Sequence, residues 1–191
     1  VFFLKRGDLD AMSDIFWCRV GTSGGVGLPG GTVVVSSDGV MADLKPFRLL
    51  RGRDGEYWFD GTFPPATYQA IIAANAEADF DIVSGKTVAG NEFFLEQFRL
   101  DGALCFEDHE SKMEWLRWLE ENGVRNIEME GAMLAGYLNH WGFGKFAMIC
   151  CTLLNRLEGA QVTASPEQLH KFSEDSGVAL FNYLAASLLG A

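Results

Sequence analysis

The sequence predicts an α/β fold: a single domain of three layers, α/β/α, in which helices cover both faces of a central mixed, largely parallel sheet. Three observations predict it. Short apolar or β-branched runs alternate with amphipathic stretches, glycine and proline mark most of the changes between them, and no period of 20–50 residues repeats. A chain of 191 residues is long enough to bury a substantial core.

The first half of the chain supplies three predicted strands, a hairpin and a helix. Residues 15–20 are an apolar run that enters a glycine cluster, and residues 31–36 are rich in β-branched side chains, so both are predicted strands. The polar stretch 37–61 is predicted to hold a hairpin and its turns. Two prolines open a predicted helix over 64–78, because proline is tolerated in the first helical turn, and 81–89 returns to strand.

The second half supplies three predicted helices and two strands. Residues 109–122 form an amphipathic pattern that ends at a glycine, which predicts a helix, and 125–127 is a short strand. A second helix is predicted over 128–141. Its core lacks charged residues and has apolar side chains on more than one face, so we expect it to be buried. A long apolar strand follows over 145–154, and a proline opens the last helix, over 166–189.

Composition excludes several classes of protein. Lys plus Arg is 15 and Asp plus Glu is 26, so the formal charge is 15 − 26 = −11, which argues against binding nucleic acid or an anionic membrane through a basic face. The most apolar windows, such as 146–154, are too short to span a bilayer, and the apolar opening 1–4 runs at once into charged residues, unlike a secretory signal. We therefore expect a cytoplasmic protein.

The cysteines and histidines do not form a metal-binding pattern. The four cysteines contain no C-x-x-C pair and all lie in apolar runs, which predicts buried, reduced thiols. The three histidines are scattered without ligand spacing, so we expect no metal site.

Ligands of such folds lie beyond the carboxyl ends of strands, so residues just after each strand are candidates for a site. The first predicted strand ends in R-V-G-T-S-G-G-V-G, residues 19–27. Its glycines would let backbone amides converge on an anion, and Arg19, Thr22 and Ser23 would add donors for phosphate. A plain glycine turn explains the same residues equally well.

Three further segments offer polar groups in the same way. Glu128 and Glu130 precede the apolar helix, where they would either grip the hydroxyls of a sugar or simply cap the helix. Arg156 follows the long apolar strand, as a pocket residue or as a surface ion pair. Gln97 and Arg99 would share one face of an extended segment and together could read a flat ring bearing oxygen and N–H groups. A phenylalanine at 93 or 94 could stack on that ring.

Together these segments resemble the nucleoside phosphorylase-I superfamily, and within it the uridine phosphorylases of animal type. The resemblance is carried, in the order and spacing of that family, by R-V-G-T-S-G-G-V-G, Q-F-R-L-D-G-A-L-C, N-I-E-M-E-G-A and T-L-L-N-R-L-E-G. It covers essentially the whole chain, so residues 1–191 are expected to be the C-terminal two thirds of a nucleoside phosphorylase domain, with the front of that domain outside this sequence.

The resemblance implies reversible cleavage of uridine by phosphate, giving uracil and ribose 1-phosphate. It assigns phosphate to Arg19 and Thr22, the uracil ring to Gln97 and Arg99, and catalysis to Arg19, Gln97 and Arg99. The ribose falls to Met129 and Glu130, with Glu128 beside them, and the base is further contacted by Phe93, Arg156, Leu153 and Leu154. No cofactor or metal is expected, since phosphate is the co-substrate, and a homodimer or hexamer with shared sites is implied.

Two features keep alternatives open. Glu96 stands where the family commonly has glycine, and a side chain there would shift Gln97, which leaves room for a nucleoside-binding paralogue with impaired catalysis. A purine nucleoside phosphorylase or nucleosidase would share the fold and the ribose motif. Such enzymes usually place an aspartate after the late strand, where this chain has Asn155, so the sequence favours a pyrimidine.

Overall fold

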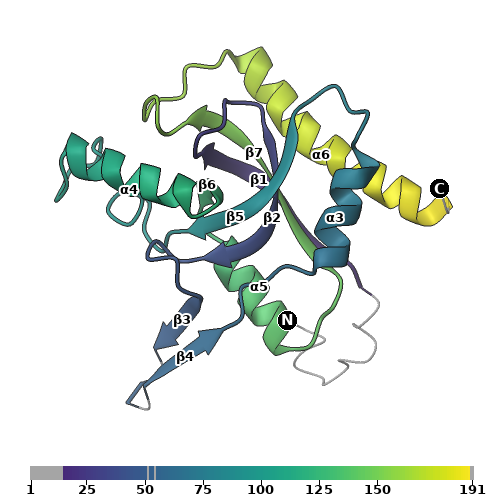
Figure 1. The fold of residues 1–191 in the computed structure, drawn as a ribbon, viewed down its shortest axis with the longest axis horizontal. Helices are drawn as coiled ribbons and strands as arrows, with labels where there is room; N and C mark the ends of the chain where they lie inside the picture. Colours follow the sequence, from purple (N-terminus) through teal and green to yellow (C-terminus); the bar gives the residue numbers. More distant parts are fainter. Residues whose placement is uncertain (1–14, 51, 54, 190–191) are drawn as a thin grey trace.

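A closed barrel of five strands forms the centre of the computed structural model, which describes residues 15–50, 52–53 and 55–189 (Figure 1). The barrel strands of this part of the chain follow the order β1-β6-β5-β2-β7. Their bounds are β1 Trp17–Gly25, β2 Val33–Val40, β5 Ile82–Ala89, β6 Val124–Glu128 and β7 Phe146–Asn155. The pairings β1–β7, β2–β5 and β5–β6 are parallel, while β1–β6 and β2–β7 are antiparallel. The predicted mixed, largely parallel sheet with helices is confirmed, and the sheet closes on itself.

The helices of the described residues lie around the barrel, as Figure 1 shows. The helices are α3 (Pro65–Ala74), α4 (His109–Glu121), α5 (Gly131–His140) and α6 (Pro166–Leu189). α3 and α6 lie together over β2 and β7, where Ile71 and Ala179 join Val33 and Ile149 in one buried cluster. α4 covers the opposite side, and α5 packs beneath the barrel. The helices therefore surround the barrel.

The predicted hairpin is present as β3 (Phe47–Leu50) and β4 (Glu56–Phe59), which extend away from the barrel (Figure 1). Its base is fixed by aromatic packing against α5. The rings of Phe47 and Phe59 lie 5.8 and 5.4 Å from the ring of Tyr137. These edge-on contacts fix the hairpin to α5.

The expectation that the second central helix is buried all round is wrong. α5 starts only at Gly131, and its side chains Met133 and Tyr137 are 41% and 36% exposed, as is Trp141 just after it at 48%. The helix lies on the barrel surface and buries only the face that carries Ala132, Ala135 and Leu138. An apolar face of α5 is therefore left open in this chain.

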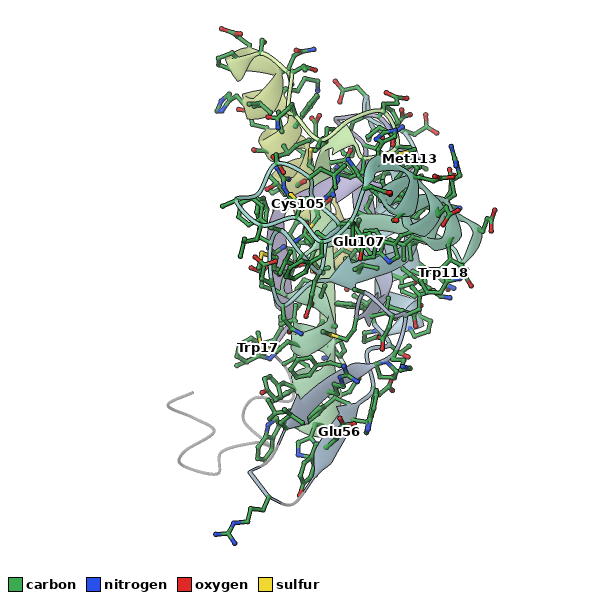
Figure 2. The ribbon with its side chains drawn as sticks, turned by 90° about the vertical axis from the view of Figure 1, so that its left-hand side faces the viewer. Trp17, Glu56, Cys105, Glu107, Met113 and Trp118 are labelled. Carbon is green, nitrogen blue, oxygen red and sulfur yellow. The ribbon has the colours of Figure 1, made fainter. Side chains whose placement is uncertain are left out.

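The prediction that the cysteines are buried holds for some of them but not for all. Cys150 and Cys151 are buried in β7 and Cys18 is half-buried, but Cys105, which is labelled in Figure 2, is exposed. The prediction is wrong at Cys105 because its apolar neighbours lie in an irregular surface segment. All four thiols are unpaired. No helix in the described part of the chain is long and apolar enough to span a membrane; the apolar opening 1–4 lies outside the described residues.

A chain of buried hydrogen bonds crosses the barrel interior. The Ser36 hydroxyl lies 2.6 Å from that of Thr87, which donates to the Asn126 side-chain oxygen at 2.7 Å. The Asn126 amide donates to Ser23 at 2.9 Å, and Ser23 donates to the carbonyl of Cys151 at 3.3 Å. Each barrel strand contributes one member, so the network ties together the strands whose ends form the site described below.

Replacing Thr87 by valine is expected to lower the free energy of unfolding by about 1–3 kcal/mol, because the buried partners Ser36 and Asn126 each lose a hydrogen bond. Urea denaturation followed by circular dichroism measures the change. The matched control is Thr62→Val, the same substitution at an exposed position, with an expected effect within about 0.5 kcal/mol. Equal effects of the two substitutions would show that the buried network contributes nothing.

Candidate functional site

One cavity of about 260 Å³ gathers the residues predicted from the sequence. It is lined by residues 19–24 of β1, by the end of β6 and by the end of β7, and on another side by residues 90–105, the pocket segment, which runs between β5 and α4. The predicted residues that line it are Arg19, Thr22, Ser23, Phe93, Gln97, Arg99, Glu128, Met129, Glu130, Leu153, Leu154 and Arg156. The four strand-end segments, far apart in the sequence, therefore meet in one place.

Residues 19–27 are predicted to contain a glycine loop or turn, and this conformation is wrong for residues 21–25. β1 continues through them to Gly25 and pairs with β7, so their backbone groups belong to the barrel. The glycines instead make room for arginine side chains. A Cβ atom at Gly21 would lie 2.5 Å from Arg19 Nη1, and one at Gly24 would lie 3.0 Å from Arg156 Cδ.

Arg19 lies among two carboxylates and a thiol. Its Nη2 contacts the Glu130 carboxylate, while its Nη1 lies 3.6 Å from Glu128 Oε2 and 3.1 Å from Cys150 Sγ. Burial opposes the charge of the guanidinium, but Cys150, Glu128 and Glu130 outweigh burial and raise the pKa of Arg19 above its ordinary value. Arg19 therefore presents a permanent positive charge at this end of the pocket. The Ser23 hydroxyl, also predicted as a phosphate donor, is committed to the barrel network.

Glu128 ends β6 and also caps the helix that follows. Its two carboxylate oxygens accept from the backbone N–H groups of Glu130 at 2.9 Å and Gly131 at 2.8 Å. Burial raises the pKa of Glu128 to about 7, because loss of solvent outweighs the two N–H donors and the nearby Arg19. Glu128 therefore caps α5, as one of the two interpretations predicts, and it also lines the pocket; its contact with sugar hydroxyls stays a prediction.

The raised pKa of Glu128 predicts a specific pH dependence of stability. The folded protein holds this proton more tightly than the unfolded chain, so its stabilisation is complete below pH 4.5 and is lost as pH rises to about 7. Unfolding free energies measured across this range should contain a fall of about 3 kcal/mol that is missing in Glu128→Gln. Glu121→Gln, at an exposed carboxylate, should keep that fall. The same pH slope in both variants would contradict the assignment.

A second polar group lies at the other end of the pocket. Arg156, only 2% exposed, donates to the backbone oxygen of Gln97 at 2.7 Å and to its side-chain oxygen at 3.4 Å. Burial, and then the neighbouring Arg99, lower the pKa of Arg156 to about 10. The alternative of a surface ion pair between Arg156 and Glu158 is thereby excluded, since Arg156 is buried against Gln97.

Arg99 reaches the pocket from a segment that is not extended, contrary to the prediction. Residues 91–104 form successive bends and turns. The Arg99 guanidinium lies 4.4 Å from the centre of the Phe93 ring and is held by Asp101 through bonds of 3.0 and 2.6 Å. Gln97 and Arg99 nevertheless line the same cavity, together with Phe93. This end of the pocket combines an amide, a guanidinium and an aromatic ring.

Glu96 points away from the cavity. Its carboxylate accepts from the backbone N–H of Asn91 at 2.6 Å and from the Asn91 side chain at 3.3 Å. Glu96 thus closes a local turn, while Gln97 beside it is buried and lines the pocket. Glu96, which stands where the family commonly has glycine, therefore does not displace the Gln97 amide from the cavity.

Sequence reasoning missed two apolar residues of the wall, Ile127 and Val162. Ile127 precedes Glu128 on β6, and the antiparallel pairing with Gly24 signals its place. Val162 lies in the turn-rich stretch before α6, where no local pattern marks it. In the described part of the chain, no group of three or more His, Cys, Asp or Glu side chains is arranged to hold a metal ion.

Comparison with known proteins identifies the family of the chain. Residues 18–189 match the phosphorylase superfamily. The chain belongs to this superfamily. It is 39% identical over 158 residues to "Uridine and thymidine phosphorylase" of Caenorhabditis elegans, a match that covers 82% of this chain and 52% of the relative.

Other members of the superfamily are similar over most of the chain. "Inactive uridine phosphorylase B" of Schistosoma mansoni is 31% identical over 173 residues, which cover 90% of this chain and 58% of the relative. The crystal structure of Schistosoma mansoni uridine phosphorylase in complex with thymine superposes with a TM-score of 0.86 and 28% identity, covering 100% of this chain and 69% of that one. The chain spans little more than half the length of these curated relatives.

Proposed function

We propose that this chain carries the nucleoside site of an enzyme that cleaves uridine with phosphate, reversibly, to give uracil and ribose 1-phosphate. One observation carries the proposal: a single cavity has one guanidinium and two carboxylates at one end, and an amide, two further guanidinium groups and an aromatic ring at the other. A nucleoside has the same polarity, with hydroxyls on its sugar and carbonyl and N–H groups on its base. Phosphate, the second substrate, is an anion suited to Arg19.

The proposed reaction needs little more than positioning and charge stabilisation. A phosphate oxygen forms a bond to the anomeric carbon of ribose as the bond from that carbon to uracil nitrogen breaks, and the electron pair leaves with uracil. Gln97 and Arg99 stabilise the negative charge that develops on uracil more than they stabilise the neutral base, which is differential binding of the transition state. Arg19, with Thr22, holds the phosphate against the sugar, and Met129 and Glu130 hold the ribose.

No cofactor or metal is required by this scheme. Phosphate is already an anionic nucleophile, so no side chain or metal need activate it. Arg156 lines the base end of the pocket, and its bonds to Gln97 fix the amide that reads uracil. Leu153 and Leu154 supply an apolar wall beside the ring.

The pocket favours a pyrimidine over a purine. Asn155, at the position where purine enzymes of the superfamily usually carry aspartate, accepts from the backbone N–H groups of Gly27 and Leu157, each at 3.2 Å. Its amide donates to Glu158 at 3.1 Å, so this side chain is engaged outside the pocket. The similar proteins named for uridine and thymidine, and the neighbour crystallised with thymine, support the same class of base.

An absorbance assay of uracil release tests the proposal. The purified protein should release uracil from uridine only when phosphate is present, and should act more slowly on inosine. Thymidine belongs in the same series, because the similar Caenorhabditis elegans protein is named for both nucleosides. Release without phosphate would indicate a nucleosidase, and preference for inosine would indicate a purine enzyme.

A nucleoside-binding protein without turnover is the second candidate. The observation in its favour is the 31% identity to a relative named inactive. The same assay decides: binding of uracil by calorimetry without any release from uridine and phosphate would support this candidate.

We also propose a homodimer, or a hexamer, in the cytoplasm. The exposed apolar face of α5, with Met133, Tyr137 and Trp141, supports association, because such faces mark contact surfaces. The net charge of −11 and the unpaired thiols agree with a cytoplasmic location. Light scattering after gel filtration measures the assembly, and a monomer would refute it.

A further inference from the structure

The pocket segment has no helix or strand of its own, yet it holds Gln97 and Arg99 at one cavity. Two backbone bonds close its central turn: Phe98 N–H donates to the Leu95 carbonyl at 3.1 Å, and Arg99 N–H donates to the Phe94 carbonyl at 2.8 Å. The residue between the two pocket side chains is Phe98, which does not line the cavity itself. Its conformation therefore decides where its two neighbours point.

Phe98 has a φ of +50°, in the left-handed region that favours glycine. A bulky side chain pays a steric cost there, and such a conformation persists only where the surroundings fix it. The ring of Phe98 is stacked on that of Trp115, with centroids 4.5 Å apart and planes inclined by 11°. This stack is the contact that can offset the backbone cost.

Trp115 is itself held firmly. It lies on α4 and its Nε1 donates to the backbone oxygen of Ala42 at 3.2 Å. Its ring packs against the buried cluster that contains Leu116 and Leu119. Figure 2 shows how the chain around Cys105 and Glu107 lies next to this helix, which carries Met113 and Trp118. The stack thus connects an irregular segment to a rigid part of the core.

We propose that the stack of Phe98 on Trp115 is the device that aims Gln97 and Arg99 into the pocket, so that Phe98 and Trp115 are positioning residues for base recognition. The inference rests on the proposed function, because it takes uracil as the ligand of that pair. Neither ring lines the cavity, so both act through the backbone between Gln97 and Arg99. Arg19, at the other end, has no contact with the stack and keeps its place when the stack is lost.

Steady-state kinetics of the purified protein with uridine and phosphate tests the proposal. Trp115→Ala is expected to raise the KM for uridine about tenfold or more, because a small misplacement of binding groups is costly. The KM for phosphate should stay within about twofold, since Arg19 is not moved. Trp115→Phe keeps a flat ring and should restore most of the uridine KM. Trp118→Ala, at an exposed tryptophan on the same helix, is the control and should change neither constant.

Substitutions at Phe98 separate the ring from the backbone. Phe98→Gly loses the stack but adopts a positive φ freely, whereas Phe98→Ala loses the stack and keeps the steric cost. Phe98→Ala should therefore weaken uridine binding more than Phe98→Gly. Calorimetric binding of uracil to all these variants should follow the same order as the uridine KM.

The proposal is overturned if Trp115→Ala leaves uridine KM and uracil affinity unchanged, or if it weakens phosphate and uridine equally. Thermal unfolding of each variant, measured in parallel, identifies one that fails to fold, and Trp115→Phe then carries the comparison. Absence of turnover in the unsubstituted protein would refute the proposed function instead. Uracil calorimetry on the same variants would still decide whether the stack positions the pair.

Discussion

Replacing Arg19 by methionine is expected to lower kcat/KM for phosphate about a thousandfold, while uracil binding is kept. The guanidinium is the cation at the sugar end of the pocket, whereas Arg99 and Arg156 lie with Gln97 at the other end. Its removal also leaves the Glu128 and Glu130 carboxylates without the cation they now contact, so the site repels an anion. Loss of attraction and gain of repulsion act in the same direction.

Kinetics at varied phosphate with saturating uridine measures this effect, and calorimetry with uracil measures the base site. The control is Arg117→Met, which removes the same charge from an exposed position on α4 and should leave both quantities within about twofold. A phosphate KM unchanged by Arg19→Met would show that the anion binds elsewhere. Loss of uracil binding in the same variant would show that the substitution disrupts the whole pocket.

The elements and the pocket residues were predictable for a physical reason. Apolar runs, prolines and glycines are local signals, so α4, β5 and the start of α6 were predicted within a few residues. Polar residues at the ends of apolar strands are candidates for a site, and Glu128 and Arg156, at the ends of β6 and β7, line one cavity. Arg19 lines the same cavity from inside β1, because that strand continues past the predicted end. Short-range patterns thus located a site built by long-range contacts.

The features that sequence reasoning missed depend on pairing between distant segments. The glycines among residues 21–25 predict a loop, because glycine disfavours strands. Hydrogen-bonded pairing with the long strand β7 nevertheless continues β1 through these residues. Barrel closure likewise rests on pairings of β1 with β6 and β7, which no local pattern encodes. The open face of α5 was missed because an apolar pattern cannot tell which side meets the barrel.

Arg156 shows how a residue can be costly for folding and still belong at a site. It is buried without a carboxylate partner among the described residues, its Nε has no hydrogen-bond partner there, and its pKa is lowered to about 10. A buried charge of this kind costs stability, and apolar replacements of similar volume are often neutral or stabilising. Its retention is explained by the two bonds that fix Gln97.

Arg156→Met is therefore expected to separate stability from activity. The free energy of unfolding should change by less than about 1 kcal/mol, because removal of the buried charge offsets the loss of its two hydrogen bonds to the buried Gln97. The kcat/KM for uridine should fall about a hundredfold, because Gln97 loses the guanidinium that sets its amide, while phosphate binding at Arg19 is kept. Urea denaturation and uracil release measure the two effects, with Arg117→Met as the control. A large loss of stability without a specific loss of uridine turnover would mean that Arg156 is held for packing, and that the Gln97 amide is fixed by other contacts.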